Sequence, residues 1–490
     1  MVLIIDGHHF QYEMENLCRV FFPDEQINVL TGSCGNEKNS LIITTSLLKQ
    51  GVQEKIRVSI KEPLGKLRFR ETELNLPSDS DDVELSMAVE LFHLLFEYTG
   101  YRPLWGVLTG VRPSKLMNTL LASYGEQKAL EYFENKLLVS KEKTDLALRV
   151  ANAQRDIISM SDPMSFSLYV SIPFCPTRCS YCSFVSHSIT SDKAKKLLPQ
   201  YLNLLCKEIA CTAKIANHIG LKLETVYVGG GTPSILDNDQ IKKLLYVIGK
   251  EFNLDNIREF TFEAGRPDTI NAEKLRTIKG HKVSRISINP QTFSDDLLRA
   301  IGREHTSQQI IDAYKLAKNI GFANINMDII AGMPGDNFEN FKNTISKTLE
   351  LAPQGITVHS LALKRSSGIL NHQFSFEQQS VLASKMIEHS NKALSKNGYT
   401  SYYMYRQNKT VGHLENVGWC KTGFEGYYNI YMMEECHTVL AVGAGAVTKL
   451  KSPAGAQIQR IFNLKYPYEY INRFDEIIDR KEKIYEFYSS

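Results

Sequence analysis

The sequence predicts an α/β protein built around a partial (β/α)6 barrel, with an N-terminal α+β module and a mixed C-terminal domain. Between residues 166 and 365, short strand-like segments alternate with amphipathic helical segments, a pattern typical of parallel βα units. The chain has 490 residues, enough for two or three domains with large buried cores. We expect domain boundaries that divide the chain into 1–160, 161–365 and 366–490.

The N-terminal module is expected to mix strands and helices. Strands are predicted at 2–5, 41–47 and 55–60, and helices at 83–98, 115–124 and 126–157. The acidic run at 78–82 supports the first of these helices, because acidic side chains are favourable at a helix N-terminus. A segment rich in glycine, proline and cations, 100–115, follows that helix.

The central part predicts six strands, at 167–171, 225–228, 259–263, 283–289, 324–329 and 356–361. Six repeats are too few for a closed eight-stranded barrel. We therefore expect a three-quarter barrel, open on one side to admit a large substrate. The remainder should supply a helix over 375–396, aromatic loops and a charged terminal helix that together close one end of the barrel.

Bulk charge and targeting signals exclude several classes of protein. The formal net charge of +3 is too small to indicate a nucleic-acid or membrane-surface partner. The N-terminus reaches Asp6 without a basic region or a long apolar stretch, which disfavours a signal peptide. No run of about 18 apolar residues occurs, so no membrane span is expected. We expect a cytoplasmic protein with free thiols.

Three cysteines, Cys175, Cys179 and Cys182, are the most informative feature. Three thiolates in eight residues can bind three irons of a cubane cluster and leave the fourth iron open to a small molecule. A structural zinc site would need four ligands, usually as two pairs, and His187 would make an unusual fourth. A disulfide framework is disfavoured in a chain of this length without a secretory signal. The spacing therefore favours a catalytic 4Fe–4S cluster.

Other candidate residues lie where predicted strands end, and parallel barrels bind ligands at the carboxyl ends of their strands. The glycines at 229–231 can bring backbone amides close to a ligand, although a tight turn is the simpler explanation for an isolated run. Five consecutive strand ends carry such groups, and we expect one site: Cys175, then Gly229 to Thr232, Glu263, Gln291 and Asp328.

Several segments resemble the oxygen-independent coproporphyrinogen III oxidase family of the radical S-adenosylmethionine superfamily. The resemblance rests on residues 168–182, Gly229-Gly-Gly-Thr-Pro, 285–293, Gly302-Arg-Glu-His and 326–335. The wider chain is similar to the HemZ-type branch of that family, through residues 108–115, 403–408, 415–418 and 443–446.

The resemblance implies a 4Fe–4S cluster bound by the three cysteines and S-adenosyl-L-methionine. It implies that Tyr169, Gly230, Gly231 and Glu263 contact one S-adenosylmethionine, and that Thr232, Gln291, Arg303 and Asp328 contact a second. Tyr169, Gln291, Arg303 and Asp328 would then line the catalytic centre. The implied reaction is oxidative decarboxylation of coproporphyrinogen III to protoporphyrinogen IX in heme biosynthesis, with a flavodoxin or ferredoxin as electron donor.

Two residues depart from the oxidase pattern. Ser171 stands where the bacterial oxidases have a histidine, and Phe184 stands where they have a fourth cysteine. An aromatic residue at the second place is typical of the related heme-chaperone branch. A heme-binding or heme-transferring protein, or another tetrapyrrole-modifying radical enzyme, therefore remains an alternative.

A substrate with four propionates needs cations. Lys364 and Arg365, after the sixth strand, are the best candidates, with Arg406 next, because arginine binds carboxylates through paired hydrogen bonds. Arg112 and Lys115 are weaker candidates. Tyr403, Tyr405 and Trp419 could supply a flat wall for a tetrapyrrole, although such aromatics are more often part of a core.

Overall fold

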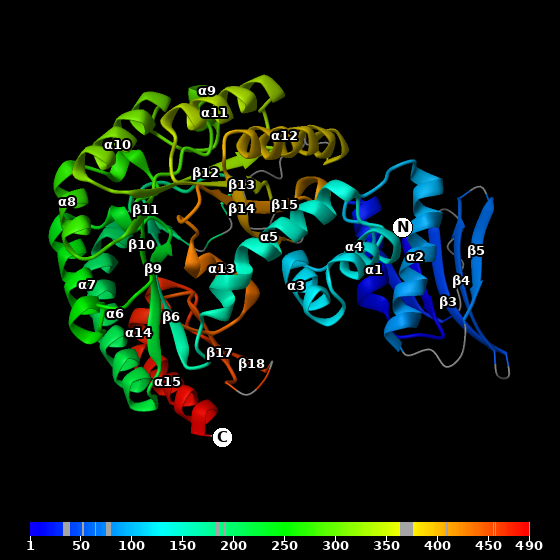
Figure 1. Cartoon of the computed structure of the whole chain (residues 1–490), viewed down its shortest axis with the longest axis horizontal. Coiled ribbons are helices and arrows are strands. Elements are labelled where there is room, and N and C mark those ends of the chain that lie inside the picture. The colour runs from blue at the N-terminus through cyan, green and yellow to red at the C-terminus, as the bar shows by residue number, and fades with distance from the viewer. Residues whose placement is uncertain are drawn as a thin grey trace. The chain divides into compact units, whose positions relative to one another are not determined.

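The structure is a computed structural model. It describes residues 1–32, 40–50, 53–63, 65–74, 80–182, 184, 186–190, 192–362, 376–407, 410–453, 455 and 457–489. The described chain divides into two compact units (Figure 1). The first contains Met1–Arg149, the start of helix α12 (Phe376–Lys396) and Arg406–His413. The second contains the rest.

The first unit contains a five-stranded sheet in the order β2-β1-β3-β4-β5. Its strands are β1 (Val2–Asp6), β2 (Asn28–Thr31), β3 (Ile42–Gln50), β4 (Gln53–Lys61) and β5 (Leu67–Glu73). Helices α1 (Gln11–Phe21) and α2 (Ser80–Thr99) belong to the same unit, and α2 packs on β4 and β5. Alternate residues of β4, namely Ile56, Val58 and Ile60, are fully buried, because one face of a sheet takes every second side chain.

The predicted helix over 126–157 is wrong in its middle. The structure has α3 (Pro113–Tyr124), α4 (Glu126–Glu131), a π-helical turn (Tyr132–Lys136) and α5 (Lys141–Ser159). Between them the backbone is held by distant partners: Val107 donates to the carbonyl of Leu137 at 2.9 Å, and Ser140 donates to that of Leu104 at 2.8 Å. Leu138 adopts φ 57° to make this break.

The second unit contains the predicted barrel strands, and the α/β partial barrel is confirmed. They are β6 (Ser165–Ile172), β9 (Lys222–Gly230), β10 (Glu259–Glu263), β11 (Arg285–Ser287), β12 (Asn324–Ala331) and β13 (Gly355–Ser360). Each pairs in parallel with the next in this order. All six carboxyl ends therefore lie at one edge.

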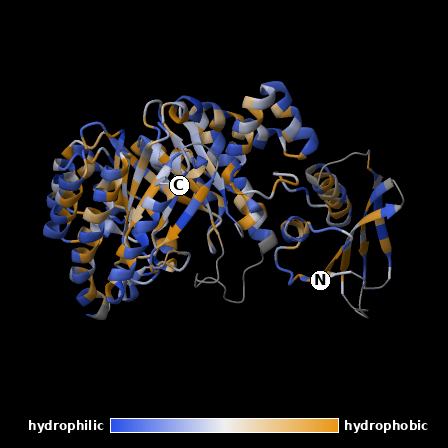
Figure 2. Ribbon diagram, turned by 90° about the horizontal axis from the view of Figure 1, so that it is seen from below, coloured by the Kyte–Doolittle hydropathy of each residue, from blue (hydrophilic) through white to orange (hydrophobic). Residues whose placement is uncertain are grey.

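Amphipathic helices cover the outside of these strands (Figure 1). They are α6 (Asp192–Ile219), α7 (Asn238–Glu251), α8 (Ala272–Gly280), α9 (Asp295–Ala300), α10 (Ser307–Ile320) and α11 (Phe338–Leu351). The ribbon in Figure 2 shows that hydrophobic and hydrophilic residues share these helices. Their ends follow capping rules, since Asp237 and Gln240 form a capping box on α7 and Gly321 ends α10 in the left-handed conformation.

The C-terminal residues extend the barrel sheet at both edges. β15 (Glu415–Cys420) pairs antiparallel with β13, and β14 (Thr400–Arg406) lies beyond it. On the other side, β16 (Thr438–Val442) pairs in parallel with β6, followed by β17 (Val447–Lys451) and β18 (Ile458–Phe462). The expected division into three domains stays a prediction.

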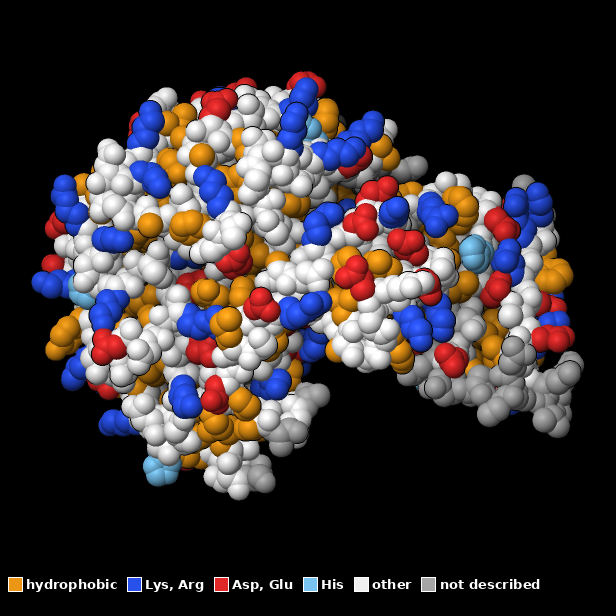
Figure 3. All heavy atoms as spheres, in the orientation of Figure 1, with side chains coloured by type: hydrophobic (Ala, Val, Ile, Leu, Met, Phe, Trp, Pro, Cys, Tyr) orange, Lys and Arg blue, Asp and Glu red, His pale blue; other side chains and the backbone are white. Residues whose placement is uncertain are grey.

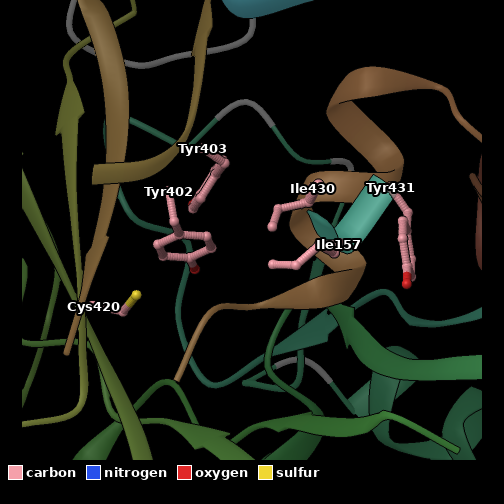
Figure 4. Close-up of a cluster of buried hydrophobic side chains, with 6 residues drawn as sticks. All are labelled: Ile157, Tyr402, Tyr403, Cys420, Ile430 and Tyr431. Carbon is pink, nitrogen blue, oxygen red and sulfur yellow. The ribbon is translucent and has the colours of Figure 1, made fainter. Parts of the chain in front are cut away.

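Helix α13 (Tyr427–Glu434) is packed against the strands of this extended sheet through a buried cluster (Figure 4). The cluster consists of Ile157, Tyr402, Tyr403, Cys420, Ile430 and Tyr431. Glycine is required at 418, because a Cβ there would lie 1.8 Å from the ring of Tyr403. Two further helices, α14 (Pro467–Asn472) and α15 (Phe474–Ser489), end the chain.

The surface has no large region of one charge on the face drawn in Figure 3, where basic and acidic side chains are interspersed. Within the described ranges, no helix is both long enough and apolar enough to span a bilayer.

Candidate functional site

The three cysteines lie in a loop that starts where β6 ends. Strand β7 (Phe174–Cys175) pairs with β8 (His187–Ser188), which closes the loop at its base. Within it, Cys182 donates from its backbone to the carbonyl of Cys179 at 3.1 Å, and Ser180 donates to that of Ile301 at 3.1 Å. All three cysteines are half-buried and free. The loop thus presents three thiols that still have access to solvent.

The thiols influence one another's charge. Burial and, to a lesser degree, the neighbouring Cys175 and Cys179 together raise the pKa of Cys182 to about 11. Burial also raises the pKa of Cys175, against hydrogen bonds from Ser186 and Thr232 that lower it. Thiols crowded in this way are protonated without a metal and release protons when they bind one.

The donor set fits an iron–sulfur cluster better than a single metal ion. Across the described residues, no group of three or more His, Cys, Asp or Glu is close enough to hold one ion. A cubane instead distributes its iron atoms among separate thiolates. Three free thiols in one loop, each partly exposed, are the donor set with which Cys175, Cys179 and Cys182 would hold the corner of a cluster with one open iron.

The glycine run packs against the chain that leads into the cysteine loop. Gly231 donates to the carbonyl of Ile172 at 2.8 Å, and Thr232 donates to that of Phe174 at 2.8 Å. A Cβ at Gly231 would lie 2.5 Å from the Phe174 carbonyl oxygen, and Gly230 has φ 108°. The Thr232 hydroxyl also donates to Sγ of Cys175 at 3.5 Å. Residues 230–232 are thus brought to the first cysteine.

Tyr169 lies in a group of three tyrosines beside Glu263. Its ring centroid is 6.2 Å from those of Tyr227 and Tyr428, and the Tyr227 and Tyr428 rings stack at 4.4 Å. The Tyr227 hydroxyl donates to Oε1 of Glu263. Burial raises the pKa of Glu263 to about 7, although the Tyr227 hydrogen bond opposes this shift. Glu263 therefore changes charge close to neutral pH.

Gln291 and Asp328 are joined through the backbone. The Gln291 amide donates to the Asp328 carbonyl at 2.9 Å, and Gln291 adopts the left-handed φ of 64°. The Asp328 side chain accepts from Asn326 at 2.8 Å and lies 3.8 Å from Nε2 of His359. Burial pushes the pKa of Asp328 upward, but the nearby His359 and the hydrogen bond from Asn326 outweigh burial and hold it below its usual value. Asp328 is therefore ionised.

Arg303 is buried and retains an unused donor. Its Nη1 donates to the Asn289 carbonyl at 2.8 Å and its Nη2 to the Tyr181 hydroxyl at 3.1 Å. Within the described residues its buried Nε has no hydrogen-bond partner. Burial lowers the pKa of Arg303, but Tyr181 and Cys179 raise it to a net value above normal. Such a donor suits a ligand carboxylate.

The cations expected to bind the substrate are Arg406, Lys364 and Arg365. Arg406 belongs to the first compact unit, where its guanidinium donates to the carbonyls of Leu108 and His413 and lies 5.4 Å from the ring of Trp105. Lys364 and Arg365 lie outside the described residues. Their contact with substrate stays a prediction, as do the other expected roles of site residues.

Sequence reasoning missed three side chains at this site. Tyr227 and Tyr428 stack on each other beside Tyr169, and His359 lies between Asp328 and the Tyr405 hydroxyl, which is 3.5 Å from its Nδ1. Tyr227 and His359 lie within buried strands, where nothing in the sequence distinguishes them from core residues. Tyr428 comes from α13, which lies far from the barrel strands in the sequence.

The chain is similar to known proteins over most of its length. Residues 169–348 match the Radical SAM superfamily. The oxygen-independent coproporphyrinogen-III oxidase-like protein HemZ of Bacillus subtilis is 32% identical over 99% of this chain and 98% of its own length. The heme chaperone HemW of Lactococcus lactis is 33% identical over 57% of this chain and 68% of its own length.

Among solved structures, coproporphyrinogen III oxidase (HemN) from Escherichia coli is similar at 20% identity and a TM-score of 0.48, covering 67% of this chain and 73% of that one. Radical SAM proteins use a 4Fe–4S cluster and S-adenosylmethionine. From the near full-length match, the chain belongs to the radical SAM superfamily and, within it, to the oxygen-independent coproporphyrinogen-III oxidase-like family of HemZ.

Proposed function

We propose that this protein is a radical SAM oxidoreductase that converts coproporphyrinogen III to protoporphyrinogen IX without oxygen, in heme biosynthesis. The observation that supports this most strongly is the extent of similarity. HemZ matches 99% of the chain, including the first compact unit, whereas the HemW relative from Lactococcus lactis matches 57%. The similarity of this chain to HemZ therefore extends well beyond the part that it also shares with HemW.

The reaction must remove one hydrogen atom, one carbon dioxide and one electron from each of two propionates, leaving vinyl groups, and the released electron needs a one-electron acceptor. The C–H bond is not acidic, so the acid and base groups of a protein cannot break it at neutral pH. When bound, the cluster and S-adenosylmethionine supply the one-electron chemistry that this bond requires. The protein's own task is to bind and orient these groups and to exclude water.

Different residues would bind the cluster and the S-adenosylmethionine. Cys175, Cys179 and Cys182 would bind the cluster. Tyr169, Gly230, Gly231 and Glu263 would hold the S-adenosylmethionine on the open iron, and Thr232, Gln291, Arg303 and Asp328 would hold a second molecule. The unused Nε of Arg303 supports this assignment, because a buried donor without a partner is costly unless a ligand accepts from it.

The proposed substrate contacts follow from the charge of the propionates, and the proposed electron donor follows from the one-electron chemistry of the cluster. Four propionates need cations, for which Lys364, Arg365 and Arg406 remain the candidates. A flavodoxin or ferredoxin is the proposed electron donor, since the cluster accepts single electrons at low potential.

A heme-binding function is the second candidate, and Phe184 is the observation that favours it. Its side chain is 62% exposed, two residues after Cys182, where the oxidases have a cysteine. Ser171 is buried and donates to the carbonyl of Ala444 at 3.0 Å, so it offers neither an imidazole nor a free hydroxyl. A chaperone would bind heme stoichiometrically and leave porphyrinogen unchanged.

An anaerobic turnover assay separates the two functions. The reconstituted protein is incubated with a chemical reductant, S-adenosylmethionine and coproporphyrinogen III, and products are followed by chromatography and mass spectrometry. We expect protoporphyrinogen together with 5′-deoxyadenosine. Deoxyadenosine without any change in the porphyrinogen would contradict the oxidase and direct attention to heme binding.

Cysteine variants provide the control. Cys179→Ala should lose the cluster's visible absorbance and all turnover. Cys211→Ala, a half-buried cysteine in α6, should keep both. Full cluster content in the Cys179→Ala variant would rule out the ligand assignment.

A further inference from the structure

A buried arginine that follows strand β10 contacts the cysteine loop that follows β6. Arg266, in the loop after β10, is 2% exposed. Its Nη1 donates to the Thr177 hydroxyl at 2.6 Å, and Thr177 lies between Cys175 and Cys179. On its other side, Nε and Nη2 donate to the two carboxylate oxygens of Asp268 at 3.0 and 2.7 Å. The guanidinium thus bridges its counter-ion and the loop.

The segment after α9 completes this arrangement. The Thr177 hydroxyl donates to the Gly302 carbonyl at 2.7 Å, and a Cβ at Gly302 would lie 3.2 Å from the carbonyl oxygen of Arg178. His305 is 2% exposed, and its Nδ1 lies 3.4 Å from Oδ1 of Asp268 without hydrogen-bond geometry. Three separate segments therefore meet at Thr177 and Asp268.

The charges are held in a fixed orientation. A buried guanidinium is costly unless it is paired, and the two-pronged contact with Asp268 offsets that cost. Burial raises the pKa of Asp268, but the adjacent His305 and the two hydrogen bonds from Arg266 outweigh burial and keep it well below its usual value, so Asp268 is ionised. The positive member of the pair faces the cysteine loop, and the negative member lies behind it.

We propose that Arg266, with Asp268 as its counter-ion, positions the cluster-binding loop through Thr177 and raises the reduction potential of the bound cluster. The physical reason is that the reduced cluster carries one more negative charge than the oxidised cluster, and a fixed positive charge nearby stabilises it. Residues behind the ligands commonly orient them and tune the metal. This role depends on the cluster that the family uses and not on the identity of the tetrapyrrole substrate.

Two variants test the charge effect with opposite expected signs. Arg266→Met removes the positive charge and should make the reduction potential more negative. Asp268→Asn removes the negative charge behind it and should make the potential less negative. Both potentials are measured by anaerobic redox titration of the full-length protein with reconstituted cluster, followed by electron paramagnetic resonance, while iron per chain is measured chemically.

Further variants separate charge from loop geometry. Thr177→Val keeps the charge but removes the bridging hydroxyl, so we expect a loss of iron per chain with little shift in potential. Arg473→Met is the matched control, because Arg473 makes a similar two-pronged contact with Glu476 that is half-exposed. It should change neither quantity.

Iron content and reduction potential together test both parts of the proposal. If Arg266→Met loses its iron, the positioning role is supported and Asp268→Asn still tests the charge effect. Shifts of the same sign in Arg266→Met and Asp268→Asn, or unchanged potentials with full iron in both, would overturn it. None of these readouts uses the decarboxylation, so a failed turnover assay leaves the test intact.

Discussion

At the scale of single residues, the charge of Glu263 is set first by burial and then by the groups around it. It lies at the carboxyl end of β10, with Tyr227 donating to it from β9 and the Tyr169 ring nearby on β6. Asp328 on β12 adds a like charge. Because its pKa is raised to about 7, it is partly protonated at neutral pH, and only the ionised form accepts hydrogen bonds with both oxygens.

Removal of the Tyr227 hydroxyl should shift the pH dependence of S-adenosylmethionine binding. In Tyr227→Phe the carboxylate loses a donor that stabilises its ionised form, so the pKa of Glu263 rises further. If S-adenosylmethionine binding needs the ionised carboxylate, the affinity falls as the pH is lowered through the pKa of Glu263. In the variant this fall should therefore begin at a higher pH than in the parent protein. Near pH 7 the variant should bind more weakly, and near pH 9 the two proteins should converge. Anaerobic calorimetry across this pH range measures the effect.

The control for this prediction is Tyr246→Phe, since Tyr246 on α7 is 62% exposed. It should leave the binding profile unchanged. Asp328, Tyr169, Tyr403 and Tyr428 are the other titratable groups around Glu263 and Tyr227. An identical profile for Tyr227→Phe and the parent would show that the carboxylate does not titrate in the binding step.

At the scale of elements, the turn after β9 is defined by backbone contact with the chain before Cys175. Gly231→Ala places a Cβ 2.5 Å from one backbone oxygen, which cannot move without displacing the cysteine loop. We expect a loss of about 1–3 kcal/mol in the free energy of unfolding, together with less iron per chain after reconstitution. Chemical denaturation and iron analysis measure the two effects.

Gly249→Ala provides the comparison. Gly249 is an exposed residue in the last turn of α7, where a Cβ meets nothing closer than 3.6 Å. Alanine there should stabilise the protein by about 0.5–1 kcal/mol, because glycine is disfavoured within a helix. Equal effects of the two substitutions would mean that the close approach at Gly231 is not what requires glycine.

The barrel strands were predictable because each is a short apolar run followed by a turn, and the sheet order follows from parallel βα succession. Within the site, the cysteine spacing and the chemistry at strand ends were visible in the sequence. The break at Leu137 to Ser140 was not, since it depends on hydrogen bonds to residues about 30 positions earlier. Tyr227, Tyr428 and His359 look like core residues in sequence, and only the fold brings them to Glu263 and Asp328.

At the scale of the second compact unit, a buried network joins the end of the chain to the start of the barrel. Glu208 of α6 is fully buried and accepts from Lys481 of α15 and Asn463 at 2.8 Å each. It also accepts from the Tyr470 hydroxyl at 2.6 Å and from the backbone of Gly443 at 2.8 Å. Gly443 follows β16, the strand beside β6, so this carboxylate fixes the edge from which the cysteine loop departs.

Glu208→Gln should therefore destabilise the unit that contains the cluster. The substitution leaves the Lys481 ammonium buried without a counter-ion, and breaking such a pair costs about 3–5 kcal/mol. The double variant Glu208→Gln, Lys481→Met removes both charges and should recover most of the loss, since an apolar replacement of a buried pair is often neutral. Lys222→Met breaks an exposed pair with Asp162 and should cost less than about 1 kcal/mol.

Chemical denaturation of the parent protein, Glu208→Gln, the double variant and Lys222→Met gives the four free energies of unfolding. Their order shows whether the charge pair or the other hydrogen bonds of Glu208 stabilise the C-terminal segment. If the double variant is as unstable as Glu208→Gln alone, the hydrogen bonds to Gly443 and Tyr470 matter more than the charge pair. If Glu208→Gln is no less stable than Lys222→Met, the C-terminal helices do not hold β16 in place. The expected order places Glu208→Gln well below the other three, because its cost comes from an unpaired buried charge in the second unit.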